Sequence, residues 1–472
     1  MGQGANVKVT DSITPNTQVR KFGMRDKLGY MFGDFGNDFF FILVANFLMV
    51  YYTDIYGVSA AFVGVLFLVA RLWDAVADVT WGRFIDTRKP TKNGKFKPWI
   101  FRMSFPLVIS GVLMFVHIPG MSNGFYEAYA FVTYILWGTL YSTVNIPYGS
   151  MASVITNDPV ERTTLSTFRT MGAMLASLII SAGGPLIIFK DNKADADGFL
   201  MAAIIFGILS IACYMACYKL STERIVMPER PKTEQKGGTS RTMKGLLKNR
   251  PLMTILIASL LFMMCTMLVG AVNVYLFKDY FSNTAALSIV GIIQTVTVFI
   301  AIPLIKPLVT KFGKKEVAAV GMLLAGIMYI LLFILPGLST NLFIGLVAVG
   351  MFGFAFFNTV VWAFVTDVID YHEYLTDLRE DGTVYSIYSF ARKVGQAIAG
   401  GIGGFAIAAV GYDATQEVQS QRTLDGIYTL ATLVPGIVYI VIFLILVFLY
   451  PLTKQRLNQL TTDLAEKRQN KN

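Results

Sequence analysis

The segment AAFVGVLFLVARLWDAVADVTWGRFIDTRKPTKNGKFK (60–97) joins an apolar run to a basic loop and places acidic residues inside the apolar run. A helix needs about 20 mainly apolar residues to cross the hydrocarbon core of a bilayer, and residues 60–85 meet that length. Similar runs recur along the chain of 472 residues, of which 54% are hydrophobic and only 15% charged. Soluble proteins are about one-quarter charged. The sequence therefore predicts an all-α membrane protein.

Further apolar runs long enough to cross a bilayer occur both before and after this segment. We expect twelve transmembrane helices, at residues 28–52, 60–85, 98–119, 125–153, 166–189, 198–220, 252–280, 284–308, 315–336, 341–370, 382–411 and 425–453. A polar stretch rich in Pro, Gly and charged residues separates the first six from the last six. The expected organisation is a cytoplasmic N-terminal tail (1–27), an N-terminal six-helix bundle (28–220), a cytoplasmic linker (221–250), a C-terminal six-helix bundle (251–453) and a cytoplasmic C-terminal tail (454–472).

Basic residues fall in alternate loops of this predicted topology. They follow the second span (Arg88, Lys89, Lys92, Lys95 and Lys97) and the eighth span (Lys311, Lys314 and Lys315), whereas the loops at 53–59, 118–126 and 337–341 contain no Lys or Arg. Because cytoplasmic loops carry this excess, we expect a multi-pass protein of the cell membrane with both termini in the cytoplasm. The same placement accounts for the formal charge of +10 and leaves no basic groove for nucleic acid.

Two six-helix halves around a polar linker are typical of transporters of the major-facilitator type, in which substrate and ion sites lie near the bilayer midplane. The sequence contains no P-loop, no HExxH motif and no nucleophile elbow. It also offers no group of nucleophile and base, or of metal ligands, that would indicate catalysis. We therefore expect a carrier rather than an enzyme, acting as a monomer, with no cofactor beyond a co-transported ion.

Arg71, Asp74 and Asp78 share one face of the second predicted helix, because they are spaced by three and four residues. A charged side chain near the bilayer centre costs at least about 2.5–3.5 kcal/mol on insertion scales, so this face must point into the bundle. We interpret Asp74 and Asp78 as a cation-coupling pair. The alternative is an internal salt bridge with Arg71 that only organises the bundle.

Charged residues in three other helices predict contacts with a solute. Asp38 lies in an aromatic run of the first helix, and Arg169 and Lys393 place cations in the fifth and eleventh helices. The alternative for Asp38 is exposure to water near a helix end, close to Asp34. The alternative for the two cations is that they extend toward the membrane interface.

The fourth helix combines aromatic, hydroxyl and amide side chains with a proline in the run WGTLYSTVNIPYG (137–149). Proline frees a backbone carbonyl, which is tolerated where protein or water can pair with it. Aromatic faces beside amides and hydroxyls suit a sugar, whose ring can stack while its hydroxyls find partners. Tyr141, Asn145 and Tyr148 are therefore candidate substrate contacts. A helix-packing surface of small polar residues is the alternative.

The tenth helix ends in WAFVTDVIDYHEY (362–374), and a run of mixed charge follows it. A gate that closes the cytoplasmic side would pair Asp367 or Asp370 with Arg162, whereas the alternative is a solvated loop. Trp362 is a further candidate substrate contact. His372 is expected at the surface.

Several of these runs, in this order, resemble the glycoside-pentoside-hexuronide:cation symporter family, typified by melibiose permease, a branch of the major facilitator superfamily. The most specific are YMFGDFGNDF (30–39), YYTDIYGVS (51–59), LFLVARLWDAVAD (66–78), GKFKPW (94–99), LWGTLYSTVNIPYGS (136–150), TDVIDYHEY (366–374) and YSIYSFARKVGQAI (385–398). The resemblance covers nearly the whole chain. It implies roles for residues at matching positions: Asp74, Asp78 and Ser142 at the cation site, Asp38 on sugar hydroxyls, and Tyr141, Arg169 and Lys393 beside both sites.

Four positions depart from the family's pattern. Ala77 replaces a sodium-ligating asparagine of melibiose permease, Asn145 a second sugar-binding aspartate, Gly149 a stacking tryptophan and Asn37 a lysine. The sugar pocket is therefore altered, with Asn37 and Asn145 as candidate contacts. Since sodium requires several oxygen ligands and a proton requires one carboxylate, Ala77 favours proton coupling, with Na+ at Asp74 and Asp78 as the other option.

We therefore expect a secondary active symporter that carries a sugar (a glycoside, disaccharide or xyloside) together with a cation, by alternating access between the two bundles. A lipid or lysolipid:cation symporter of the same superfamily is the main alternative, and the polar fourth helix argues against it. A membrane sensor without transport would leave Asp74 without a role.

Overall fold

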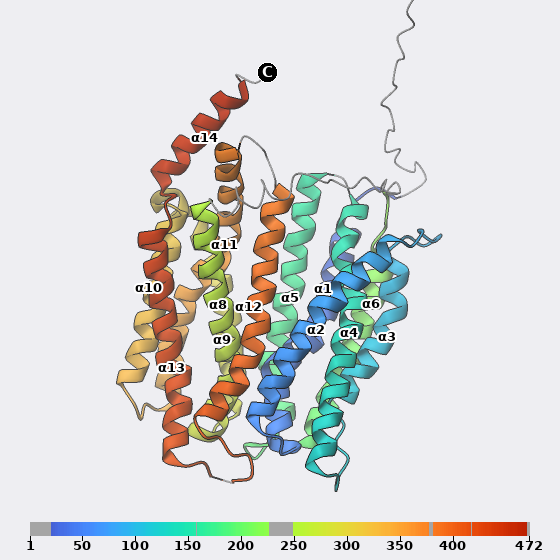
Figure 1. The fold of residues 1–472 in the computed structure, drawn as a ribbon, viewed down its shortest axis with the longest axis vertical. Coiled ribbons are helices and arrows are strands. Elements are labelled where there is room, and N and C mark those ends of the chain that lie inside the picture. The colour runs from blue at the N-terminus through green and yellow to red at the C-terminus, as the bar shows by residue number, and fades with distance from the viewer. Residues whose placement is uncertain (1–19, 157, 226–248, 377–380, 417, 470–472) are drawn as a thin grey trace, which may run out of the picture.

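The structure, a computed structural model, describes residues 20–156, 158–225, 249–376, 381–416 and 418–469. Its long helices run side by side, with α1–α6 in one part of the molecule and α8–α13 in the other (Figure 1). In this described part of the chain, nine helices are long and apolar enough to cross a membrane. The predicted all-α membrane fold is confirmed.

The N-terminal half contains six long helices: α1 (Met24–Val50), α2 (Ala60–Asp86), α3 (Lys97–Leu113), α4 (Asn123–Ile155), α5 (Pro159–Ile188) and α6 (Ala196–Leu220). A π-helical turn, η1 (Tyr51–Ile55), extends α1. Between α5 and α6, the strands β1 (Phe189–Lys190) and β2 (Lys193–Ala194) pair in an antiparallel hairpin, with Phe189 opposite Ala194. Two boundaries differ clearly from those predicted, since α3 ends at Leu113 rather than 119 and α5 begins at Pro159 rather than 166.

The C-terminal half has the same number of long helices among its described residues: α8 (Arg250–Tyr275), α9 (Ala285–Phe312), α10 (Lys314–Ile334), α11 (Thr340–Thr376), α12 (Asp381–Ala409) and α13 (Gln421–Leu444). The π-helical turns η2 (Leu276–Tyr280) and η3 (Ile445–Leu449) extend α8 and α13. The first helix of each half therefore ends in a π-helical turn.

Three of these twelve helices, α3, α4 and α12, are not among the nine that pass the test for membrane crossing. The helix α3 has only 17 residues, α4 carries many polar side chains, and the apolar part of α12 is confined to Val394–Ala409. Their order along the chain matches the predicted order of spans. Twelve crossings therefore stay a prediction at these three helices.

The residues from 454 onward form a helix, α14 (Lys454–Gln469), where the sequence predicts a tail. Leu457, Leu460 and Leu464 recur at helical spacing, and the last two are buried. Lys467 Nζ donates a hydrogen bond to the Tyr374 carbonyl at 3.2 Å, so α14 packs against the end of α11. Because this segment is mainly polar, its three leucines at helical spacing do not stand out in the sequence, and the helix is not predicted.

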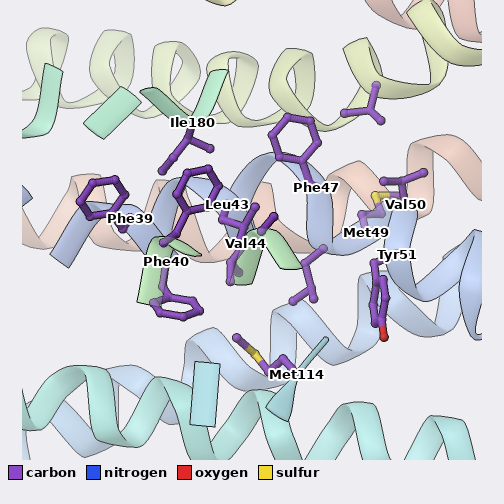
Figure 2. Close-up of a cluster of buried hydrophobic side chains, with 14 of the residues drawn as sticks. Phe39, Phe40, Leu43, Val44, Phe47, Met49, Val50, Tyr51, Met114 and Ile180 are labelled. Atoms are coloured by element: carbon purple, nitrogen blue, oxygen red, sulfur yellow. The ribbon is translucent and has the colours of Figure 1, made fainter. Parts of the chain in front are cut away.

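The helix α1 supplies much of the core of the N-terminal half. Figure 2 shows buried side chains of α1 and its π-turn, with residues of neighbouring segments beside them: Phe39, Phe40, Leu43, Val44, Phe47, Met49, Val50, Tyr51, Met114 and Ile180. On another face, Gly36 lets α6 approach, because a Cβ at this position would lie 3.2 Å from the Ser210 carbonyl oxygen. Small residues permit such close packing of helices in membranes.

Both described chain ends lie at one end of the bundle, here named the terminal end (Figure 1). At the other end, here named the opposite end, α1, α5 and α8 finish and α2, α9 and α13 begin. The halves meet closely toward this opposite end. A Cβ on Gly404 of α12 would lie 2.5 Å from Gly64 Cα of α2, and one on Gly291 of α9 would clash with Ser181 of α5. These glycines therefore allow direct backbone contact between the two halves.

Candidate functional site

An ion pair between α1 and α5 forms the first part of the candidate site. Arg169 Nε donates a hydrogen bond to Asp34 Oδ1 at 3.0 Å. The Asp34 side chain is 9% exposed and that of Arg169 is 43% exposed, so the carboxylate is buried and its cation is only partly covered. The sequence favours Asp38 as the carboxylate near Arg169, whereas the structure pairs Arg169 with Asp34, one turn earlier on the same face of α1.

Asn37 is buried and hydrogen-bonded at both ends of its amide. The Tyr214 hydroxyl of α6 donates to Asn37 Oδ1 at 2.7 Å, and Asn37 Nδ2 donates to Asn145 Oδ1 of α4 at 3.3 Å. This side chain therefore joins α1, α4 and α6. Asn145 Nδ2 has no partner among the described residues, so it can bind a solute. Asp38, next to Asn37, is only partly buried.

Aromatic rings lie against these polar groups. The ring of Tyr148 stacks on that of Tyr30 at a centroid distance of 4.7 Å, and it lies 5.6 Å from the Arg169 guanidinium. Its hydroxyl donates to the Tyr30 carbonyl at 2.7 Å. Tyr141 stacks on Phe41 of α1 at 6.0 Å. Because Tyr148 is buried and Tyr141 is partly exposed, Tyr141 is the more accessible ring of the two.

The predicted cation pair lies where α2 meets α4. Arg71 Nη1 is 3.5 Å from Asp74 Oδ2, and both side chains are partly exposed. Gly138 of α4 makes room for this carboxylate, because a Cβ there would lie 2.5 Å from Asp74 Oδ1. Ser142 is buried one turn further along α4 and donates to the Gly138 carbonyl at 3.3 Å. The structure thus brings Asp74 next to the helix turn of Ser142, with Asp78 one turn further along α2.

Phe41 connects this ion pair to the polar residues of α1. The Arg71 guanidinium lies 5.5 Å from the centroid of the Phe41 ring, and that ring stacks on Tyr141. Phe41 follows Asp38 by three residues and so shares its face of the helix. Contacts therefore run from Asp74 through Arg71 to a ring that lies one turn from Asp38.

Two predicted substrate contacts come from the C-terminal half. Trp362 of α11 packs edge-on against Tyr388 of α12 at a centroid distance of 5.4 Å, and Trp362 is 42% exposed. Ser259 of α8 donates to the Tyr388 hydroxyl at 3.3 Å, so Trp362 borders the contact of α8, α11 and α12. Lys393 lies within α12, and its side chain is outside the described residues. Its role stays a prediction.

The predicted gate residues lie toward the terminal end, and for two of them, Asp367 and Arg162, the structure shows a partner in the same half. Lys314 Nζ of α10 donates to Asp367 Oδ1 of α11 at 2.6 Å, so Asp367 is paired within the C-terminal half. Arg162 Nε of α5 donates to a backbone carbonyl just after α4 at 2.9 Å, within the N-terminal half. Both of these contacts lie within one half, and the pairing of Asp367 or Asp370 with Arg162 stays a prediction. Asp370 is partly buried in α11, and His372 is fully buried rather than at the surface as expected.

A cluster at the opposite end does join the halves. We name it the latch; its residues are Thr53, Asp54, Tyr275, Lys278 and Tyr412. Lys278 Nζ forms an ion pair with Asp54 and donates to the Tyr412 hydroxyl at 2.8 Å. That hydroxyl donates to Asp54 Oδ1 at 2.9 Å, and the Thr53 and Tyr275 hydroxyls are 3.0 Å apart. The Lys278 and Asp54 side chains are 9% and 13% exposed, so this ion pair is largely shielded from water.

The β-hairpin provides a second connection beside the latch. Asn192, between β1 and β2, accepts a hydrogen bond from the Thr284 amide at 3.0 Å and donates to the Ser282 carbonyl at 2.6 Å. Its φ of 62° is in the left-handed region, which asparagine tolerates better than most residues. The loop between α5 and α6 therefore reaches the C-terminal half.

Thr53 and Asp54 lie in the run YYTDIYGVS (51–59), but the sequence predicts no partner for them and no role for Tyr275, Lys278 or Tyr412. Asp54 and Lys278 lie at the ends of predicted spans, where charged side chains usually contact water. The available signal is their equivalent position, because each follows the first apolar span of its half.

Comparison with known proteins provides an independent line of evidence. The family model described as MFS/sugar transport protein matches residues 29–454. The chain is 34% identical to the uncharacterized symporter YjmB of Bacillus subtilis, over 95% of this chain and 96% of the relative. It is 33% identical to the glucuronide carrier protein homolog of Escherichia coli, over 95% of this chain and 97% of the relative. A crystal structure of a D-xylose-proton symporter shares the fold, with a TM-score of 0.62 at 16% identity, over 91% of this chain and 98% of that one.

From the ion pair of Asp34 and Arg169 we predict an interaction free energy between the two side chains that stability measurements can detect. Arg169→Gln leaves a buried carboxylate without its cation, and we expect it to destabilise the protein by about 1–3 kcal/mol. The loss should be smaller than for a fully buried pair, because Arg169 is 43% exposed. Adding Asp34→Asn should restore most of the loss. Thermal unfolding of the purified protein across this double-mutant cycle checks the pair, and strictly additive losses would contradict it.

Proposed function

Because the chain belongs to the MFS/sugar transport protein family, and there to carriers of the glycoside-pentoside-hexuronide:cation type, we propose that it is a symporter of a sugar with a cation. It is a membrane transporter and not an enzyme. The proposed solute is a glycoside, disaccharide or xyloside, and the proposed cation is H+. The proposed location is the cell membrane, with both termini in the cytoplasm.

The observation that supports this proposal most is the series of contacts from Asp74 through Arg71 and Phe41 to Tyr141. It links an ionisable carboxylate on α2 to the face of α1 that carries Asp38. A symporter requires such a link, because binding of the ion must change the free energy of solute binding. These residues all belong to one half, so the other half can move relative to both sites.

The chemistry of the solute site supports a sugar. Asp38 and the free amide nitrogen of Asn145 offer an acceptor and a donor for hydroxyl groups, and Tyr141 offers a ring face for stacking. A lipid carrier would instead require a mainly apolar cavity. The charged pair of Asp34 and Arg169 beside this site argues against that alternative.

The surroundings of Asp74 support a proton rather than sodium. Na+ at this carboxylate would place a second positive charge near the Arg71 guanidinium, which already lies 3.5 Å from it. Ala77 supplies no oxygen ligand. A proton neutralises Asp74 with no further ligands and releases Arg71 to the Phe41 ring and to Asp78. We propose that this change favours closure of the halves around a bound sugar.

Because the latch holds the two halves together at one end, we assign the structure to one state of the transport cycle. The halves are tied at the opposite end, whereas Asp367 and Arg162 have partners in their own halves at the terminal end. If the terminal end faces the cytoplasm, as the loop charges predict, the latch joins the halves on the outer side. Transport then requires the latch to separate.

Uptake into right-side-out vesicles tests the proposed function. We expect accumulation of a labelled glycoside under an imposed pH gradient, acidic outside, with or without sodium. Asp74→Asn imitates the protonated carboxylate, so we expect this variant to exchange glycoside across the membrane but not to concentrate it. Uptake that follows sodium and ignores the pH gradient would refute proton coupling, and normal accumulation by Asp74→Asn would refute the role of Asp74.

A glycine pair on α4 tests the geometry of the cation site separately. The methyl group of Gly138→Ala would lie 2.5 Å from Asp74 Oδ1 and must displace the carboxylate. We expect the pH dependence of uptake to shift and accumulation to fall about tenfold, which corresponds to about 1.4 kcal/mol. Gly124→Ala on the same helix is the control, because its methyl group would have no neighbour within 4 Å. Equal behaviour of the two variants would argue against a functional Asp74–α4 contact.

A further inference from the structure

A cavity of about 200 Å³ lies between the two halves. Its walls come from α1 and α5 of the N-terminal half and from α8, α9, α10, α11 and α13 of the C-terminal half. Its polar lining includes the amides of Asn46, Asn273 and Gln294 and the hydroxyls of Ser177 and Ser181. None of the described residues around it is charged. The cavity therefore differs in chemistry from the region of Asp34 and Arg169.

Along α1, this cavity lies between the candidate sugar site and the latch. Phe41 and Ala45 line the cavity and follow Asp38 by three and seven residues, so they share its face of the helix. At 1.5 Å per residue, Asn46 lies about 12 Å beyond Asp38 and about 10 Å before Thr53 of the latch. The cavity therefore begins about one turn beyond Asp38 on this face of α1 and lies on the side toward the latch. One pyranose ring cannot reach from Asp38 to Asn46, whereas two linked rings can.

The amides around the cavity are free to bind a ligand. The side chains of Asn46, Asn273 and Gln294 have no hydrogen-bond partner in the part of the chain that the structure describes. Each amide offers two N–H donors and one carbonyl acceptor. Polar groups inside a bundle are costly unless they are paired, so a hydroxyl-rich ligand would stabilise them. Gly270 leaves room for Asn46, because a Cβ at this glycine would lie 3.2 Å from Asn46 Oδ1.

We propose that this cavity is a second sugar subsite, which binds the distal, uncharged ring of a two-ring glycoside through Asn46, Asn273 and Gln294. The inference rests on the proposed function, because the first ring is held near Asp38. Pockets that hold a complete ligand have volumes of about 300–1,000 Å³. This cavity is smaller, so it fits one part of a solute rather than all of it. Since both halves supply amides, a ring bound here bridges them and favours the closed latch.

Matched one-ring and two-ring probes test the subsite on the full-length protein. The probes are methyl xyloside with xylobiose, methyl glucoside with cellobiose, and methyl galactoside with lactose, and calorimetry measures their binding. For Asn273→Ala and Gln294→Ala we expect affinity for the two-ring probe to fall about tenfold, and affinity for its methyl glycoside to change less than about twofold. Thr295→Ala is the matched control, because this residue neighbours Gln294 on α9 but does not line the cavity.

The binding of the two probes to the variants decides whether the cavity is a sugar subsite. Equal losses for both probes, or no loss for either, would overturn it. Gly270→Ala narrows the cavity without removing an amide, and it should give the same selective loss even where an amide variant folds poorly. If the wild-type protein binds none of the probes, the proposed function fails and the subsite with it. If it binds them and the variants show no selectivity, only the subsite fails.

Discussion

A charge inside a membrane-spanning bundle is costly unless an opposite charge, a backbone carbonyl or water pairs with it, and this constraint organises the structure. Asp34 with Arg169 ties α1 to α5, Asp74 with Arg71 lies where α2 meets α4, and Asp54 with Lys278 joins the two halves. Because the surroundings are apolar, each pair interacts more strongly than it would in water. Protonation of one partner, or separation of the two helices, therefore changes the free energy of the whole arrangement.

The three pairs differ in what they join, and this difference suits alternating access. The first, between Asp34 and Arg169, holds α1 to α5 within the N-terminal half, and the second, between Arg71 and Asp74, lies within α2. The third, with Asn192 beside it, connects the halves where the first helix of each half ends in a π-helical turn. Such turns in helices often mark functional positions. A sugar held between the halves would add contacts on the inner side of the latch, while a proton at Asp74 removes a charge that closure would bury.

The sequence predicts the features that depend on local energetics and leaves open those that depend on tertiary contacts. The helices and the buried face of Asp74 follow from the cost of polar groups in lipid. Asp34 and Asp38 share one face of α1, so only the position of α5 decides which of them meets Arg169. Asp54 and Lys278 are 224 residues apart, and their pairing requires knowledge of how the halves meet. The helix α14 is missed because an apolar stripe is weak within a mainly polar segment.

The ion that accompanies the solute provides the most direct test of the central claim, that neutralisation of Asp74 drives sugar transport. A glycoside that the protein binds can be added to right-side-out vesicles in a weakly buffered, sodium-free medium while an electrode records the external pH. We expect the medium to become alkaline in step with entry of the labelled glycoside, and we expect Asp74→Asn to abolish this pH change. Entry of the glycoside without a pH change, or entry only after sodium is added, would contradict it.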